Sequence, residues 1–182
     1  SLLGFVSFFL LTGACTVNTC NCLEVKEEPV NVRDSVKKTY TQEIGVREAT
    51  GKNDGTDVEK YLRSTNLGKG YAWCAAFVNW CLKEAGAAHN NSAWSPSLLP
   101  SSRVIYTRGA KNNKVPQSGD VFGIYFSSRK RIAHVGFIDQ WSADVAITVE
   151  GNTNNAGSRE GDGVYRKRRL VKQIYKVATW VK

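Results

Sequence analysis

The chain has 182 residues, of which 42% are hydrophobic and 23% are charged. This composition fits one globular domain with a full hydrophobic core and argues against a second independent domain. The formal net charge is +9, and no Lys or Arg precedes residue 26, so the positive excess belongs to the folded part. Such a charge is compatible with binding to nucleic acid, to an acidic wall polymer or to a membrane surface. It is equally compatible with a basic surface that contacts only solvent, so charge alone does not identify a partner.

The N-terminal segment predicts export. Residues 2–11 form an apolar run, and three small residues then lead to Cys15. The run is too short for a transmembrane helix, which needs about 20 apolar residues. It also resembles a bacterial lipoprotein signal with Cys15 as the lipidated residue, although Thr12 stands where that pattern prefers an aliphatic side chain. Plain secretion, or a hydrophobic N-terminal helix packed on the domain, remains an alternative.

We therefore expect an exported protein that is periplasmic, anchored in the cell envelope as a lipoprotein, or secreted. Because the sequence begins with Ser and contains no Met, we expect its natural start to lie upstream. Residues 1–14 are assigned to the signal, residues 15–33 to a tether with few large apolar side chains, and residues 34–182 to the domain.

The first half of the domain predicts helices. Val36, Tyr40, Ile44 and Val46 form the apolar stripe of a helix that we expect to run from about residue 34 to 49. Other helices are expected around residues 56–62 and 73–85, with one more that ends at residue 108. The helix at 73–85 is apolar on nearly every face in its first two turns, which is typical of a helix buried in the middle of a domain.

The second half predicts strands. Short β-rich segments alternate with turns at residues 121–126, 132–140, 145–150, 164–170 and 174–181. Helices followed by strands indicate an α+β domain with an antiparallel sheet.

Five cysteines fall into two groups. Cys15, Cys20 and Cys22 crowd the N-terminus with no His nearby, which is poor zinc spacing, so we expect disulfide pairing or one lipidated Cys beside two others. Cys74 and Cys81 lie on the third helix with Cα atoms about 10 Å apart, too far for a disulfide. The helix N-terminus favours the thiolate of Cys74, whereas Cys81 is expected to be inert. On position alone, Cys74 could also be a small buried hydrophobe.

His134 is the candidate base for Cys74. Alternation along residues 131–138 places His134 opposite the apolar face, and we expect Gly136 to leave room in front of its ring. On the next strand, Glu150 shares the face of His134. A three-residue hairpin loop would oppose His134 and Glu150 directly, and other registers would keep Glu150 or Asn152 within reach. A cysteine nucleophile needs a base held by a third polar group, although His134 alone could be structural.

Four motifs in order resemble the CHAP family, the cysteine, histidine-dependent amidohydrolase/peptidase domains related to NlpC-type cell-wall peptidases. The resemblance covers about residues 45 to 180, and its motifs are the helical Cys segment at 70–80, the Pro-x-x-Gly-Asp turn at 116–121, the strand His at 133–136 and Glu-x-Asn at 150–152. It implies a papain-like α+β fold and a catalytic site made of Cys74, His134, Glu150 and Asn152.

The resemblance also implies a substrate. Family members cleave a peptide or muramoyl–alanine amide of peptidoglycan through a thioester, with the oxyanion held partly by the Cys74 N–H, and Tyr71 is a candidate second donor. Calcium-binding relatives carry acidic residues before the Cys, but residues 64–70 contain no carboxylate, so we expect no metal and no cofactor. Asn53, Asp54 and Asp57 are explained more simply by a turn and a helix start than by a cation site.

The remaining polar and aromatic features have plain structural interpretations. Residues 129–131 are expected to form a hairpin tip and residues 166–169 a solvated strand, although both basic runs could grip anionic glycan or lipid headgroups. Trp94, Trp141 and Trp180 could line a sugar or peptide site, but packing is commoner for such residues.

Two function classes stay open. The first is an exported, monomeric endopeptidase or N-acetylmuramoyl-L-alanine amidase that acts on peptidoglycan peptides. The second is a catalytically inactive lipoprotein module that binds wall polymer or a partner protein. Nucleic-acid binding has only the charge in its favour, because no nucleic-acid-binding motif is visible and an export signal argues against it.

Overall fold

A computed structural model describes residues 31–155 and 161–181. The expected export signal, the lipidation site Cys15, and Cys20 and Cys22 lie outside the described residues. The helices are α1 (Val32–Gln42), α2 (Thr56–Arg63) and α3 (Cys74–Glu84), and short 3-10 turns form η1 (Ser95–Leu98), η2 (Ser127–Arg129) and η3 (Val171–Gln173). The strands are β1 (Val104–Thr107), β2 (Val121–Phe126), β3 (Arg131–Trp141), β4 (Val145–Thr153), β5 (Gly163–Leu170) and β6 (Lys176–Ala178).

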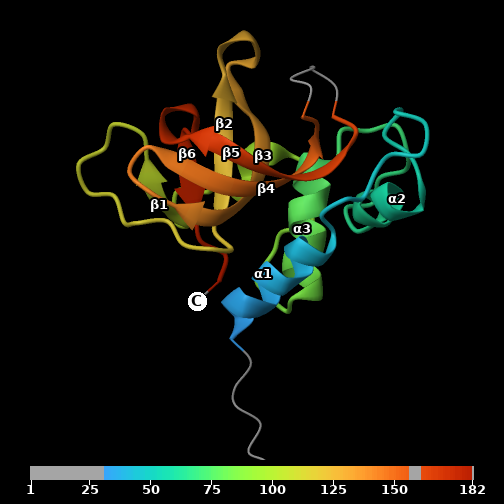
Figure 1. Cartoon of the computed structure of the whole chain (residues 1–182), viewed down its shortest axis with the longest axis horizontal. Coiled ribbons are helices and arrows are strands. Elements are labelled where there is room, and N and C mark those ends of the chain that lie inside the picture. The colour runs from blue at the N-terminus through green and yellow to red at the C-terminus, as the bar shows by residue number, and fades with distance from the viewer. Residues whose placement is uncertain (1–30, 156–160, 182) are drawn as a thin grey trace, which may run out of the picture.

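The strands form one antiparallel sheet with the order β1-β6-β2-β3-β4-β5. Helices come first in the chain and most of the strands follow, so the expected α+β class is confirmed. Helix α3 packs on β3 and β4, with α1 and α2 against its other sides. In Figure 1, α3 stands between the sheet and α2.

Two elements differ from the sequence-based expectation. Helix α1 ends at Gln42 instead of continuing to about residue 49, because Gly45 adopts a positive φ of 104° and its N–H donates to the Val164 carbonyl oxygen. The chain there pairs with the start of β5. The helix expected to end at residue 108 is also wrong, since this segment forms strand β1, which pairs with β6.

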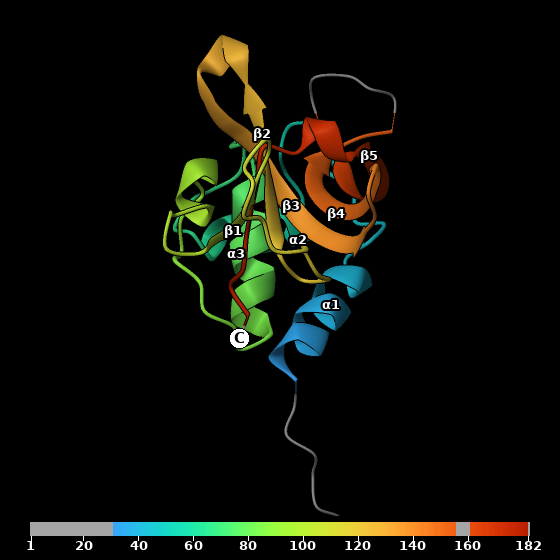
Figure 2. The same ribbon diagram turned by 90° about the vertical axis from the view of Figure 1, so that its left-hand side faces the viewer.

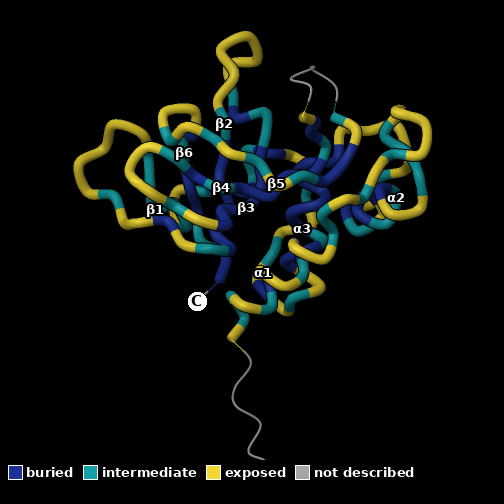
Figure 3. Tube along the Cα trace, viewed as in Figure 1, coloured by how far each residue is buried: buried dark blue, intermediate teal, exposed yellow. Residues whose placement is uncertain are grey.

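The core lies mainly between the helices and the sheet. The largest fully buried side chains include Trp73, Tyr40, Tyr61 and Phe77, and Figure 3 shows α3 as a largely buried helix. A smaller cluster of Phe122, Ile138, Ala146, Ile174 and Val177 forms a second core around the sheet. Burial of the first two turns of α3 on nearly every side confirms the expectation from its apolar sequence.

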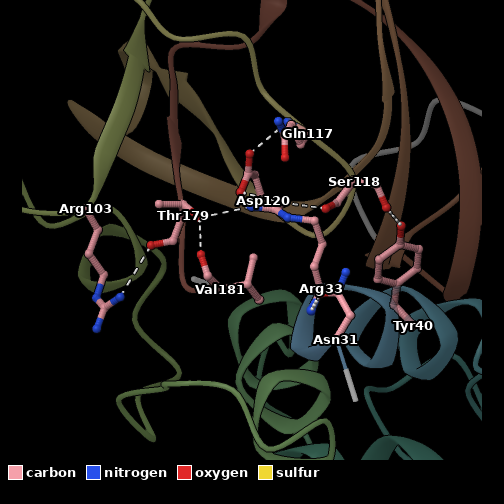
Figure 4. Close-up of polar contacts among 9 residues, drawn as sticks. All are labelled: Asn31, Arg33, Tyr40, Arg103, Gln117, Ser118, Asp120, Thr179 and Val181. Atoms are coloured by element: carbon pink, nitrogen blue, oxygen red, sulfur yellow. Dashed lines mark hydrogen bonds and ion pairs between the residues drawn. The ribbon is translucent and has the colours of Figure 1, made fainter. Parts of the chain in front are cut away.

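A polar cluster ties α1 to the turn before β2 (Figure 4). The Arg33 guanidinium donates to the Ser118 carbonyl oxygen at 2.6 Å and to Asp120 Oδ1 at 3.0 Å. Asp120 is buried, and its Oδ2 accepts the Gln117 N–H at 2.8 Å. The aspartate of the Pro-x-x-Gly-Asp motif thus closes its own turn and binds a helix, which fixes where β2 begins.

Candidate active site

Cys74 is the first residue of α3. Its side chain is only 6% exposed, and its Sγ lies 3.6 Å from the Oγ of Ser95, the first residue of η1. Trp73, at the N-cap, has no side-chain acceptor for the N–H groups of the first turn. These unpaired N–H groups and the helix dipole favour a negative charge at the sulfur.

His134 lies on β3 and contacts Glu150 of β4. His134 Nε2 is 2.8 Å from Glu150 Oε2. The register of direct opposition is not adopted: Phe137 pairs with Val149, which places Glu150 across from Gly136, and this is one of the shifted registers expected to keep Glu150 within reach of His134. The two side chains therefore meet diagonally on one face, as such cross-strand neighbours can.

Gly136 makes this diagonal contact possible. A Cβ at Gly136 would lie 3.0 Å from the Glu150 Cγ, 2.9 Å from the Phe122 ring and 2.8 Å from the Val149 carbonyl oxygen. The space expected in front of the imidazole is thus filled by the Glu150 side chain and the edge of Phe122. A larger residue at position 136 would therefore clash with Glu150, Phe122 or the backbone of Val149.

Glu150 is fully buried and bound on both oxygens. Its Oε1 accepts the Thr148 hydroxyl at 2.6 Å and Arg169 Nε at 2.8 Å, while its Oε2 accepts His134 and Arg169 Nη2. Burial opposes its ionisation, but the hydrogen bonds from Arg169 and His134 hold the pKa of Glu150 well below its usual range. Arg169, on β5, thus keeps a buried carboxylate charged beside the imidazole.

Cys74 and His134 shift each other toward an ion pair. Burial opposes ionisation of the thiol, but the hydrogen bond with His134 and the charge of the imidazolium hold the pKa of Cys74 below its usual range. Burial likewise opposes protonation of His134, yet the hydrogen bonds with Cys74 and Glu150 raise its pKa to about 9. Because Nε2 is engaged by Glu150, Nδ1 is the ring nitrogen left to face the sulfur.

Asn152 lies on β4 two residues after Glu150, but its side chain bonds to Asn53 and Glu48 and not to His134. Its amide Nδ2 donates to Asn53 Oδ1 at 2.8 Å and approaches Glu48 Oε1 at 3.5 Å. The cause is an extra residue of β4 between Glu150 and Thr153, where Asn152 adopts a positive φ of 53°. The structure therefore brings together Cys74, His134 and Glu150.

Glu48 connects Asn152 to the nucleophile helix. Its Oε1 also accepts Trp73 Nε1 at 2.9 Å, and its Oε2 accepts the Asn53 N–H at 2.9 Å. Trp73 immediately precedes Cys74, so the hydrogen bonds among Asn152, Asn53 and Glu48 help to fix the position of the first residue of α3. No pattern in the sequence pointed to Glu48.

The described residues contain no cluster of three or more His, Cys, Asp or Glu side chains that could hold a metal ion. Asp54 accepts the N–H and hydroxyl of Thr50, as expected of a turn residue. Tyr71, the candidate second oxyanion donor, is exposed in the loop before α3. In the part of the chain that the structure describes, no helix is both long and apolar enough to cross a membrane.

Two site residues were missed at the sequence level. Arg169 was expected on a solvated strand, but its side chain is 19% exposed and bound to Glu150. A buried carboxylate on β4 would have predicted a cation on the neighbouring strand. Ser95 approaches the sulfur from the start of η1, and only the folded path of the chain places it there.

The three tryptophans considered as a binding wall have different surroundings. Trp180 is buried and donates its Nε1 hydrogen to the Leu98 carbonyl oxygen, and Trp141 packs edge-on against Tyr106. Trp94 alone of the three is exposed.

Comparison with known proteins relates this site to a family. No curated protein matches the chain. A solved structure described as the crystal structure of Ly7917 aligns with 13% identity over 84% of this chain and 63% of that one, with a TM-score of 0.41, a likeness too weak to support any argument. The family model of the CHAP domain matches residues 66–152, which include Cys74, His134 and Glu150. Residues 66–152 are therefore similar to the CHAP domain, whose members are in general cysteine- and histidine-dependent peptidoglycan hydrolases or amidases.

Proposed function

We propose that the protein is an exported peptidoglycan hydrolase that cleaves an amide bond in cell-wall peptides, with Cys74 as nucleophile and His134 as its base. The observation that carries this proposal is the continuous buried chain of contacts from Cys74 through His134 and Glu150 to Arg169. A purely structural histidine would need neither a thiol partner nor a charged carboxylate held by arginine.

The first step follows from the ion pair. The Cys74 thiolate attacks the amide carbon and forms a C–S bond while the carbonyl oxygen takes up the negative charge. As the tetrahedral intermediate collapses, the C–N bond breaks and the His134 imidazolium gives its proton to the leaving amine. The product is a thioester on Cys74.

The second step regenerates the enzyme. His134, now neutral, takes a proton from a water molecule that attacks the thioester carbon, and the C–S bond breaks to release the acid and the thiolate. Through both steps Glu150 accepts the Nε2 hydrogen of His134, which fixes the tautomer that leaves Nδ1 toward the sulfur. Arg169 neutralises the charge of Glu150, so Glu150 stays ionised whichever protonation state Cys74 and His134 adopt.

The oxyanion is assigned to the N-terminus of α3. Cys74 is the first residue of α3, where a backbone N–H has no acceptor within the helix, so its N–H is proposed to donate to the oxyanion. Asn152 is proposed to act indirectly, since its amide helps Glu48 to hold Trp73, the residue that precedes the nucleophile in the chain. We propose no metal and no cofactor for this reaction.

The decisive experiment compares wild type with Cys74→Ala on purified peptidoglycan, with the soluble fragments identified by mass spectrometry. We expect fragments from the wild type only, and their masses will distinguish an endopeptidase from an N-acetylmuramoyl-L-alanine amidase. Release of the same fragments by Cys74→Ala would refute the assigned nucleophile. Cys81→Ala is the matched control, because it removes a buried thiol from the same helix.

The second candidate is an inactive module that binds wall polymer. The observation that favours it is the net charge of +9. It predicts sedimentation of both wild type and Cys74→Ala with walls of several compositions and no fragment release from any of them.

Export and anchoring form a separate part of the proposal. We propose a periplasmic or envelope-anchored protein, or a secreted one, from residues 2–15 of the sequence. The N-terminal mass of the mature protein tests anchoring, because acyl chains on Cys15 would add their mass and an unmodified N-terminus would exclude lipidation.

A further inference from the structure

An arginine and a tryptophan stack on each other near the catalytic residues. The guanidinium carbon of Arg131 lies 4.1 Å from the centroid of the Trp94 ring, and Trp94 is 52% exposed. Arg131 begins β3 and pairs with Phe126, directly after the tip of the β2–β3 hairpin, which projects from the rest of the sheet in two perpendicular views (Figures 1 and 2).

An irregularity in β3 turns Arg131 toward the catalytic histidine. Ile124 of β2 pairs with His134, but the next residue, Tyr125, pairs with Ile132, so Ala133 is an extra residue. Without this bulge, Arg131 and His134 would point to opposite faces because they are three residues apart. With the bulge, both side chains share one face.

Trp94 is tied to the nucleophile through its chain neighbour. It directly precedes Ser95, whose Oγ lies 3.6 Å from Cys74 Sγ, and η1 packs on both α3 and β3. Consecutive Cα atoms are about 3.8 Å apart. The stacked pair therefore lies toward the site, with Trp94 next in the chain to Ser95 and Arg131 on the same face of β3 as His134.

The stacked guanidinium retains donors for a ligand. Stacking uses the face of the group, and one Nη1 hydrogen goes to the Ile132 carbonyl oxygen at 3.0 Å. The other hydrogens lie in the guanidinium plane, in the fork geometry that binds a carboxylate with two hydrogen bonds. Among residues 31–155 and 161–181, every ion pair that the structure contains leaves Arg131 out.

We propose that Trp94 and Arg131 form a specificity subsite that binds a carboxylate of an acidic peptide substrate next to the scissile amide. Arg131 binds the carboxylate, and Trp94 holds the guanidinium in place and covers one side of it. This inference rests on the proposed hydrolase function and adds a preference to it: wall peptides whose glutamyl carboxylate is free are better substrates than those in which it is amidated.

The test uses two muramoyl tripeptides that differ only in whether the glutamyl α-carboxylate is free or amidated. We expect wild type to cleave the free form with a kcat/KM about tenfold higher, the size expected for one partly exposed charged hydrogen bond. Arg131→Gln should lose that tenfold on the free form and cleave the amidated form like wild type. Trp94→Ala should lower the preference without removing it.

Arg129→Gln is the matched control, because it removes the same charge from the exposed tip of the same hairpin. It should keep the wild-type preference. An equal loss in Arg129→Gln, or an equal effect of Arg131→Gln on both substrates, would overturn the subsite. Thermal melting of each variant separates these outcomes from unfolding.

A binding measurement separates this inference from the hydrolase proposal. If wild type cleaves neither peptide, the proposed reaction fails, but calorimetry with Cys74→Ala still compares the two peptides as ligands. Tighter binding of the free carboxylate that Arg131→Gln abolishes in the Cys74→Ala background would support the subsite. Equal or undetectable binding of both peptides would refute it.

Discussion

The two ends of helix α3 each hold a buried cysteine, and their environments act in opposite directions. Cys81 is fully buried, and burial together with the charge of Glu43 raises the pKa of its thiol well above its usual range. At Cys74, burial also opposes ionisation, but the hydrogen bond and charge of His134, together with hydrogen bonds from Ser95 and the Val135 backbone, outweigh it and lower the pKa of the thiol. Burial alone therefore makes an inert thiol, and a charged partner on β3 makes a nucleophile.

The surroundings of the two residues explain this contrast. Cys81 lies two turns into the helix, where the backbone N–H groups are used within the helix and the charge of Glu43 acts more strongly on the thiol than that of Lys60. Cys74 has the imidazole of His134, the hydroxyl of Ser95 and the backbone N–H of Val135 around its sulfur. The same side chain thus becomes reactive or inert according to what lies within hydrogen-bonding distance.

The largest effect is expected from exchanging each cysteine for alanine. Cys74→Ala should lower kcat by at least about a thousandfold, because no other group can form the thioester. Cys81→Ala should retain the wild-type rate. Iodoacetamide followed by peptide mapping should label Cys74 of the native protein and leave Cys81 unmodified. Faster labelling of Cys81 would reverse the assignment.

The carboxylate behind His134 should give the next largest effect. Glu150→Gln keeps the shape of the side chain but removes the charge that stabilises the imidazolium, so we expect kcat to fall by about a hundredfold or more. Rates on soluble muropeptides, with circular dichroism as a check of folding, measure this. A rate within a factor of two of wild type would show that Glu150 does not support His134.

Replacing Arg169 should lower the stability of the fold. Arg169→Met leaves Glu150 as a buried carboxylate without its cation, which costs about 3 kcal/mol of unfolding free energy by comparison with broken buried ion pairs. Urea unfolding measures this cost. Arg168→Met is the matched control, because Arg168 is the exposed neighbour of Arg169 on β5. Equal destabilisation by both changes would mean that only surface charge matters.

The value of kcat/KM should depend on pH through the Cys74–His134 pair. Because the pKa of His134 is raised to about 9, the imidazolium should persist below that pH and be lost above it. The rate kcat/KM should therefore fall on the alkaline side near pH 9, and on the acid side as the Cys74 thiolate becomes protonated.

Glu150→Gln provides the check of this assignment. The carboxylate favours the protonated ring, so its removal should lower the pKa of His134 and move the alkaline limb to lower pH. An alkaline limb that stays near pH 9 in Glu150→Gln would indicate that another group causes it.

The residues around the reactive thiol of Cys74 could be predicted from local patterns in the sequence. The apolar helix with Cys74 at its start, the alternation that isolates His134, and the parity of Glu150 are each visible within a few residues. The α+β order of helices and strands was also predictable from periodicity. The helix end at Gln42 was not, because it depends on pairing of Gly45 and Val46 with β5, far away in the sequence.

What was missed depends on irregularities and long-range contacts. A bulge between Glu150 and Thr153 redirects Asn152, and another at Ala133 turns Arg131 to the catalytic face. A strict alternation of inward and outward side chains along a strand cannot predict either bulge. Arg169 and Ser95 come from segments 19 residues after Glu150 and 21 residues after Cys74, so only the fold brings them to the site.

The smallest expected effect concerns Ser95. Its Oγ lies 3.6 Å from the sulfur and its hydrogen bond helps to lower the pKa of Cys74, but His134 contributes more. Ser95→Ala should therefore slow the reaction by about threefold to tenfold, the size of one weak hydrogen bond. It should also shift the pH at which iodoacetamide reacts with Cys74 to a higher value. Ser97→Ala, two residues along the same 3-10 turn, should leave both rate and reactivity unchanged. If Ser95→Ala slowed the reaction without that pH shift, its hydroxyl would act on the position of η1 and not on the thiolate.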